Sequence, residues 1–180
     1  MATREEYEQL KAFARIDGAI VGGLWIISFA CFIGEFHNAA LGFLAMVGGL
    51  SSVVVAAIRM KKFRDNVLDG IISFRRAFGY SLFTFAYAAL LMAAAQYIYF
   101  QFIDNGFVIS KYIEMTTTPE FKTLVNVYGI NEAEMKTAIE TLSKLRPIDI
   151  SFQFLTTNII LGVMISLPLA ALVKSNRKNK

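Results

Sequence analysis

Apolar and polar residues follow one another along this chain in long blocks. Four apolar blocks contain no Asp, Glu, Lys or Arg, and they cover residues 18–34, 39–58, 77–103 and 150–173. A helix needs about 20 such residues to cross the roughly 30 Å of hydrocarbon in a bilayer. Because backbone groups in hydrocarbon must be hydrogen-bonded within their own segment, the blocks predict four transmembrane helices. The expected fold class is all-α, an integral membrane four-helix bundle that forms a single domain of residues 1–180.

The composition supports this interpretation. The chain has 180 residues, of which 56% are hydrophobic and 16 are phenylalanine, and its mean hydropathy is +0.51. These values exceed those of ordinary soluble domains. A membrane β-barrel would instead show segments of about ten residues with alternating polarity. The chain shows no such alternation, so the barrel class is excluded.

Lysine and arginine are distributed unequally between the segments that flank the spans. The N-terminal segment, the second loop and the C-terminal tail hold 13 bases and six acids, a net charge of +7. The first turn and the 104–149 segment hold five bases and eight acids, a net charge of −3. Because cytoplasmic segments carry the excess of Lys and Arg, both termini and the second loop are predicted to be cytoplasmic. Residues 35–38 and 104–149 are then expected outside.

The basic residues also indicate the partners. The isoelectric point of 9.2 is compatible with nucleic-acid binding, but the bases lie next to the membrane ends, where anionic lipid headgroups are found. We therefore expect membrane lipids with anionic headgroups on the cytoplasmic side as partners, and no nucleic acid. A membrane protein partner or a homo-oligomer fits the pattern as well. The single cysteine, Cys31, excludes a disulfide within one chain.

Residues 59–76 contain the most regular cytoplasmic pattern. Apolar residues recur near helical spacing among the bases, which predicts a cytoplasmic interfacial helix that ends at Gly70. The alternative is a solvated basic loop. The residues expected to contact anionic lipid are Arg59, Lys61, Lys62, Arg64, Arg75 and Arg76. The N-terminal segment, with acids before bases, predicts a short helix that leads into the first span.

Small residues recur at helical spacing in the first two spans. Gly18 and Gly22 in the first span, and Gly42 and Gly49 in the second, are predicted to allow close helix packing. Since only four residues separate these spans, we expect an antiparallel hairpin in which the small residues pack one span against the other. A role in lining a pore is the alternative.

The 104–149 segment contains typical helix-capping signals. Thr118 followed by Pro119 predicts the start of one helix. Asn131 with Glu134 three residues later predicts a capping box at the start of another. Together with residues 107–115, these helices are expected to form a small extracytoplasmic helical cap, which rests on the bundle or on lipid. A groove for a protein partner is the functional alternative.

Two polar residues lie deep in the apolar spans. Gln96 and Asn158 are each eight positions from the outer end of their span, which corresponds to a depth of about 12 Å. We predict that their amides form an interhelical hydrogen bond.

One stretch resembles a known family. The run from Asp69 to Phe78, DGIISFRRAF, precedes a span rich in small residues that ends in Tyr97-Ile98-Tyr99-Phe100. This arrangement resembles the bacterial domain of unknown function 4199 family, and the resemblance extends over nearly the whole chain. It implies a small protein of the bacterial cytoplasmic (inner) membrane with four helices and a basic tail. It implies no activity, so no catalytic residues are transferred to this chain.

The sequence contains no recognisable catalytic constellation, and we expect no catalytic residues and no cofactor. Intramembrane catalysis usually relies on charged or nucleophilic groups inside the spans. The blocks contain no charged residue, and Ser28 and Ser81 have no nearby histidine or lysine at bilayer depth. Glu35, His37 and Glu114 are of the residue types that bind zinc, but one histidine in a polar turn is usually solvated. No metal site is therefore predicted.

Three functions remain open. The preferred one is a non-catalytic accessory or scaffolding component of a bacterial inner-membrane envelope process. The second is a small oligomeric transporter or channel, for which the mildly polar outer half of the last span gives some support. The third is a lipid-handling membrane enzyme.

Overall fold

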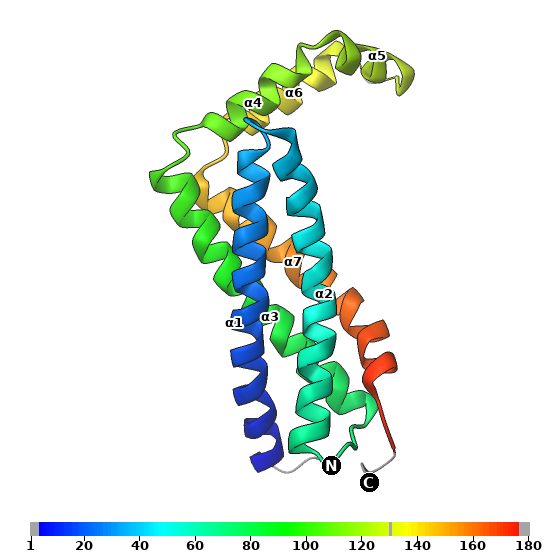
Figure 1. Ribbon diagram of the computed structural model, residues 1–180. Coiled ribbons are helices and arrows are strands. Elements are labelled where there is room, and N and C mark those ends of the chain that lie inside the picture. Colours follow the sequence, from blue (N-terminus) through cyan, green and yellow to red (C-terminus); the bar gives the residue numbers. More distant parts are fainter. Residues whose placement is uncertain (1–3, 130, 177–180) are drawn as a thin grey trace. The chain divides into compact units, whose positions relative to one another are not determined.

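The computed structural model describes residues 4–129 and 131–176, and these residues are mainly helical (Figure 1). The helices are α1 (Arg4–Gly34), α2 (Ala39–Val67), α3 (Phe74–Phe102), α4 (Phe107–Thr116), α5 (Pro119–Val127), α6 (Glu132–Ser143) and α7 (Pro147–Val173). Within the described residues, α1, α2, α3 and α7 are long and apolar enough to cross a membrane. The all-α class is confirmed, and the chain is a multi-pass membrane protein.

The helices divide between two compact units. The first unit contains the residues up to Ala95 together with those from Gln153 onward, and so holds α1, α2, most of α3 and most of α7. The second unit, Gln96–Phe152, contains α4, α5 and α6.

In the first unit, α1 and α2 form the expected antiparallel hairpin (Figure 1). The side chain of Asn38 caps α2 by accepting a hydrogen bond of 3.0 Å from the backbone N–H of Ala40. Trp25 Nε1 in α1 donates to Ser52 Oγ in α2 over 2.8 Å. Helix α1 begins at Arg4, so the predicted N-terminal helix and the first span are one continuous helix.

The hydrophobic core lies between the N-terminal halves of α1 and α3 and the C-terminal parts of α2 and α7. Its largest buried members include Met60, Phe63, Ile72 and Phe85. The Phe63 ring stacks on the Tyr80 ring, with 4.5 Å between their centroids. The core therefore lies toward the end of the first unit that contains the basic residues.

The separate interfacial helix expected over residues 59–76 is wrong. Helix α2 continues to Val67, and Met60 and Phe63 are buried in the core instead of lying in lipid. They continue the buried face that Ser52 and Ala56 begin, so the whole pattern belongs to one helix. Helix α2 ends because Asp69 (φ 50°) and Gly70 (φ 84°) adopt left-handed backbone conformations, which are typical of a helix C-terminus.

A short backbone pairing connects the start of α3 with the end of α7. Ile72 and Ser175 form an isolated antiparallel bridge with two hydrogen bonds of 3.0 Å between their backbones. Arg64 Nη1 also donates to the backbone carbonyl of Val173 over 2.9 Å. The C-terminal end of the last span is therefore held against the turn between α2 and α3.

The second unit confirms the predicted helix starts. Helix α5 begins at Pro119, and Thr118 Oγ1 accepts a hydrogen bond of 3.3 Å from the backbone N–H of Phe121. At the start of α6, Asn131 and Glu134 form the complete capping box, with hydrogen bonds of 2.8 and 3.1 Å. Helix α4 covers the residues expected to precede them.

Candidate functional site

A buried polar cluster connects three helices of the first unit. Asp17 in α1 accepts a hydrogen bond of 2.6 Å from Arg59 Nε in α2 at its Oδ1. Its Oδ2 accepts from the hydroxyl of Tyr80 in α3. The exposed fraction of Asp17 is 2% and that of Tyr80 is 1%. We call Asp17, Arg59 and Tyr80 the polar triad.

The surroundings of the triad explain how a carboxylate can be buried there. An unpaired charge in an apolar interior carries a large desolvation penalty. Here Arg59 supplies the opposite charge, and its side chain remains 33% exposed, so the guanidinium keeps access to the polar surroundings. Gly18 follows Asp17 and lets α3 approach closely enough for Tyr80 to reach the carboxylate. The triad is thus an internally satisfied link between α1, α2 and α3.

Sequence reasoning did not find this link. It assigned Arg59 to a lipid contact and gave Asp17 no role. The signal that could have found it is the hairpin itself. Asp17 lies 18 residues before Glu35, and Arg59 lies 21 residues after Asn38. At 1.5 Å per residue both are about 27–32 Å from the turn, at the same level of an antiparallel pair.

Three of the six bases expected to contact lipid are engaged within the protein. Arg59 binds Asp17, Arg64 contacts Asp65 at 2.7 and 3.1 Å, and Arg76 Nη1 is 3.2 Å from Glu6. Lys61, Lys62 and Arg75 are exposed and have no ion pair with the described residues. A paired cation contributes little net charge to the surface. The attraction to anionic headgroups is therefore expected to come mainly from these three, at about 1 kcal/mol each.

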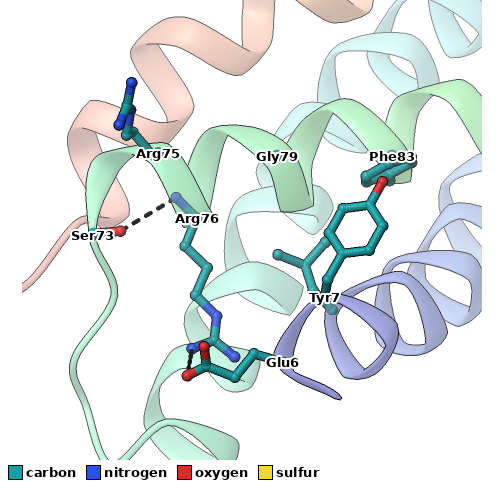
Figure 2. Close-up of a pocket in the computed structure, with 8 residues that line it drawn as sticks. Glu6, Tyr7, Ser73, Arg75, Arg76, Gly79 and Phe83 are labelled. Carbon is teal, nitrogen blue, oxygen red and sulfur yellow. Dashed lines mark hydrogen bonds and ion pairs between the residues drawn. The ribbon is translucent and has the colours of Figure 1, made fainter. Parts of the chain in front are cut away.

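A pocket lies between the first turns of α1 and the start of α3 (Figure 2). Its volume is about 510 Å³, and we call it the α1/α3 pocket. It is lined by Glu6, Tyr7, Leu10, Ser73, Arg75, Arg76, Gly79 and Phe83. The rings of Tyr7 and Phe83 meet edge to face at 5.8 Å. Figure 2 shows Arg76 reaching toward Glu6, while Arg75 points away from that pair.

The glycines predicted to pack helices lie at two different interfaces. A Cβ at Gly18 would be 2.8 Å from the carbonyl oxygen of Thr84 in α3, and one at Gly22 would be 3.2 Å from Ala88 Cα in the same helix. Gly18 and Gly22 therefore face α3, and the expectation that they pack against the second span is wrong. The hairpin contact uses Ser28, which lies beside Gly49, whereas Gly42 faces the side chain of Glu35. The glycine spacing alone could not identify which neighbour each helix face meets.

Gln96 and Asn158 fall in different compact units, so their hydrogen bond stays a prediction. Gln96 is 1% exposed, and its Oε1 has no hydrogen-bond partner among the described residues. We expect Gln96→Leu and Asn158→Leu each to lower the midpoint of thermal unfolding in mild detergent. The amide contact contributes about 0.6 kcal/mol, which corresponds to roughly 1–2 °C. If the two amides are bonded, the double variant loses less than the sum of the single losses, and an unchanged midpoint in both single variants contradicts the pairing.

Other candidate chemistry is sparse in the described part of the chain. No group of three or more His, Cys, Asp and Glu side chains there could hold a metal ion. Glu35 and His37 lie at the turn between α1 and α2, whereas Glu114 belongs to the second unit. Cys31 is half-buried in α1 and forms no disulfide.

Comparison with known proteins gives one match. The model of a family described as "Protein of unknown function (DUF4199)" matches residues 17–175. The matched range contains all three members of the polar triad and both residues of the Ile72–Ser175 bridge. No curated protein and no solved structure matches the chain.

Proposed function

The chain belongs to the family described as protein of unknown function DUF4199, and from this premise we propose that it is a non-catalytic accessory component of a bacterial inner membrane. In this role it assembles with a partner membrane protein in an envelope process. Both termini and the turn between α2 and α3 face the cytoplasm. The segment with α4, α5 and α6 faces outward.

This proposal rests on the role of the buried Asp17 carboxylate. Catalysis and ion transport inside a membrane rely on ionisable groups that are free to exchange protons or bind substrate. Both carboxylate oxygens of Asp17 are occupied by Arg59 and Tyr80, so this charge serves to join helices. Asp17 and Arg59 each adjoin the end of an apolar span, and the four spans themselves contain no Asp, Glu, Lys or Arg. The arrangement favours a structural part over an enzyme or a transporter.

The distribution of surface charge supports the orientation and a lipid partner. Lys61, Lys62 and Arg75 are unpaired among the described residues, and all three come from the segment between the second and third apolar spans. Anionic headgroups of the cytoplasmic leaflet attract such cations within about a Debye length. This surface would hold the α2–α3 turn against the membrane.

Helix α2 leaves most of its apolar surface uncovered. Of its most apolar stretch of 18 residues, 11% is buried, against 44% for α3. Exposed members of α2 include Phe43, Leu50 and Val54. Lipid covers such a surface in a monomer, and a transmembrane helix of a partner covers it in a complex. The surface is therefore available for the assembly that the proposal requires.

The test is purification of the tagged chain from its native host in mild detergent, with mass spectrometry and mass determination on the same sample. We expect one second membrane protein in stoichiometric amount. The double variant Lys61→Gln/Lys62→Gln should recover less of it, since the basic surface positions the complex. The matched control Lys136→Gln/Lys144→Gln removes the same charge from exposed sites in the second unit and should recover as much as the wild type. A pure homo-oligomer would contradict the accessory role and favour the transporter.

A further inference from the structure

The α1/α3 pocket has two chemically different ends. Tyr7, Leu10 and Phe83 form an apolar wall, whereas Ser73, Arg75 and Arg76 form a polar end. Its volume of about 510 Å³ falls among those of small-ligand sites, roughly 300–1,000 Å³. With Glu6 included, its ionisable groups carry a net charge of +1. Such a pocket suits a molecule with an anionic head and an apolar tail.

The pocket lies at the level of lipid headgroups. A Cβ at Gly18 would contact Thr84 and Tyr87, so the start of the apolar span in α1 lies beside residues 84–87 of α3. The pocket residues of α1 precede that level by two to three helical turns. Those of α3 lie on both sides of residue 77, where its apolar block begins. Ser73, Arg75 and Arg76 therefore lie on the headgroup side of this boundary, and Gly79 and Phe83 lie on its hydrocarbon side.

Gly79 provides an independent observation. Glycine inside a helix is less favourable than alanine, so it usually serves a close contact. At Gly18, Gly22 and Gly162 a neighbouring helix supplies that contact. A Cβ at Gly79 would meet nothing within 4 Å, although Gly79 lines the pocket. A side chain at this position would therefore take up space in the pocket.

The arginines supply the polar partners. Nη2 of Arg76 is buried and has no hydrogen-bond partner among the described residues. A buried donor of this kind requires an explanation, and an unseen ligand is one. Arg75, which also lines the pocket, has no ion pair with the described residues and points away from the Glu6–Arg76 pair (Figure 2). Arginine forms charge-assisted hydrogen bonds with phosphate oxygens.

We propose that the α1/α3 pocket binds one molecule of an anionic phospholipid. Its phosphate lies at the arginine end, and one acyl chain lies over Gly79 against the apolar wall formed by Tyr7, Leu10 and Phe83. This deepens the proposed function and rests on its membrane orientation, because it names the lipid class and the place where it binds.

The experiment uses the full-length chain, delipidated in mild detergent, with three probes: dioctanoyl phosphatidylglycerol, dioctanoyl phosphatidylcholine and glycerol 3-phosphate. Native mass spectrometry counts bound molecules, and the midpoint of thermal unfolding gives relative affinity. We expect phosphatidylglycerol to form a one-to-one complex and raise the midpoint, and glycerol 3-phosphate to do neither. Equal binding of glycerol 3-phosphate would show a soluble-phosphate site, and equal binding of phosphatidylcholine would show no preference for anionic lipid. Either result would overturn the proposal.

Gly79→Leu tests the position of the acyl chain. Leucine fills the open space, so affinity for phosphatidylglycerol should fall by about tenfold or more. The midpoint without lipid should stay equal or rise, because leucine favours the helix. A purely structural glycine predicts the opposite, a lower midpoint with lipid binding retained. Gly23→Leu is the matched control, since a Cβ there also meets nothing within 4 Å and the residue lies outside the pocket.

Arg75→Gln tests the headgroup end without requiring the core to repack. It should reduce the affinity for phosphatidylglycerol to that for phosphatidylcholine. The control Lys62→Gln changes an exposed cation outside the pocket and should leave the preference for phosphatidylglycerol unchanged. Wild-type affinity in both Gly79→Leu and Arg75→Gln would place the lipid elsewhere and overturn the proposal. Loss of this lipid site while a partner protein still copurifies would leave the proposed function intact.

Discussion

Replacing Arg59 by methionine is expected to lower the midpoint of thermal unfolding in detergent more than any other single charge removal in the described structure. Methionine keeps an apolar stem but leaves the Asp17 carboxylate, 2% exposed, without its counter-charge. Breaking a buried ion pair costs about 3–5 kcal/mol. Because the Arg59 side chain is 33% exposed, we expect about 2–4 kcal/mol, or roughly 5–15 °C for a chain of this length.

The control for this prediction separates the pair from a general effect of charge. Lys62→Met removes a cation that is exposed, unpaired among the described residues and outside the α1/α3 pocket, and it should leave the midpoint nearly unchanged. The double variant Asp17→Asn/Arg59→Met removes the stranded charge and should recover a large part of the loss. Equal losses in Arg59→Met and Lys62→Met, or fully additive losses in the double variant, would show that the triad does not join the helices.

Gly18→Leu is expected to have the second large effect, because it separates two helices. A Cβ at this position would be 2.6 Å from Tyr87 Cβ and 2.8 Å from the carbonyl oxygen of Thr84. The carbonyl belongs to the backbone of α3 and cannot turn aside, so α1 has to move. Overpacking of this kind costs about 1–3 kcal/mol and occasionally more, and here we expect the upper end of that range. The movement would also draw Asp17 away from Tyr80.

Two other glycines in the same helix supply a graded comparison. A Cβ at Gly22 would lie 3.0 Å from the flexible Leu91 side chain and 3.2 Å from the Ala88 backbone. Both distances exceed the closest ones at Gly18, so Gly22→Leu should be less damaging. A Cβ at Gly23 would meet nothing within 4 Å, so Gly23→Leu should be neutral or slightly stabilising. The thermal midpoints in detergent should therefore rank the variants at residues 23, 22 and 18 in falling order. Equal midpoints at 18 and 23 would contradict the close approach of α1 and α3.

The membrane helices could be predicted because their signal is local. Absence of charge over about 20 residues identifies a span without knowledge of its neighbours. The Asn131–Glu134 capping box was equally visible, since both partners lie within one helical turn. Helix α2 extends to Val67, beyond the span predicted to end at residue 58. The bases at Lys61 and Lys62 suggested a new element, but the helical phase of Met60 and Phe63 continues that of the span before them.

The candidate sites depend on which helix faces meet, and sequence spacing does not contain that information. The distances of Asp17 and Arg59 from the hairpin turn match, yet Tyr80 comes from a third helix whose position no spacing rule fixes. The pocket is subject to the same limit, because Tyr7 and Phe83 are 76 residues apart in the sequence. The sequence identified the bases near the membrane, and the structure distinguished the paired ones from the unpaired ones.

The Ile72–Ser175 bridge has a consequence for the order in which the chain assembles during synthesis. All three members of the polar triad have been made once Tyr80 is added, but the bridge needs a residue that follows 95 positions later. At about 5–20 residues per second, synthesis of that stretch takes roughly 5–20 seconds. During this interval Asp17 and Arg59 can already neutralise each other in the bilayer, while the turn before α3 still lacks its backbone partner. The fastening of α7 to this turn therefore follows the assembly of the polar triad in the biogenesis of the protein.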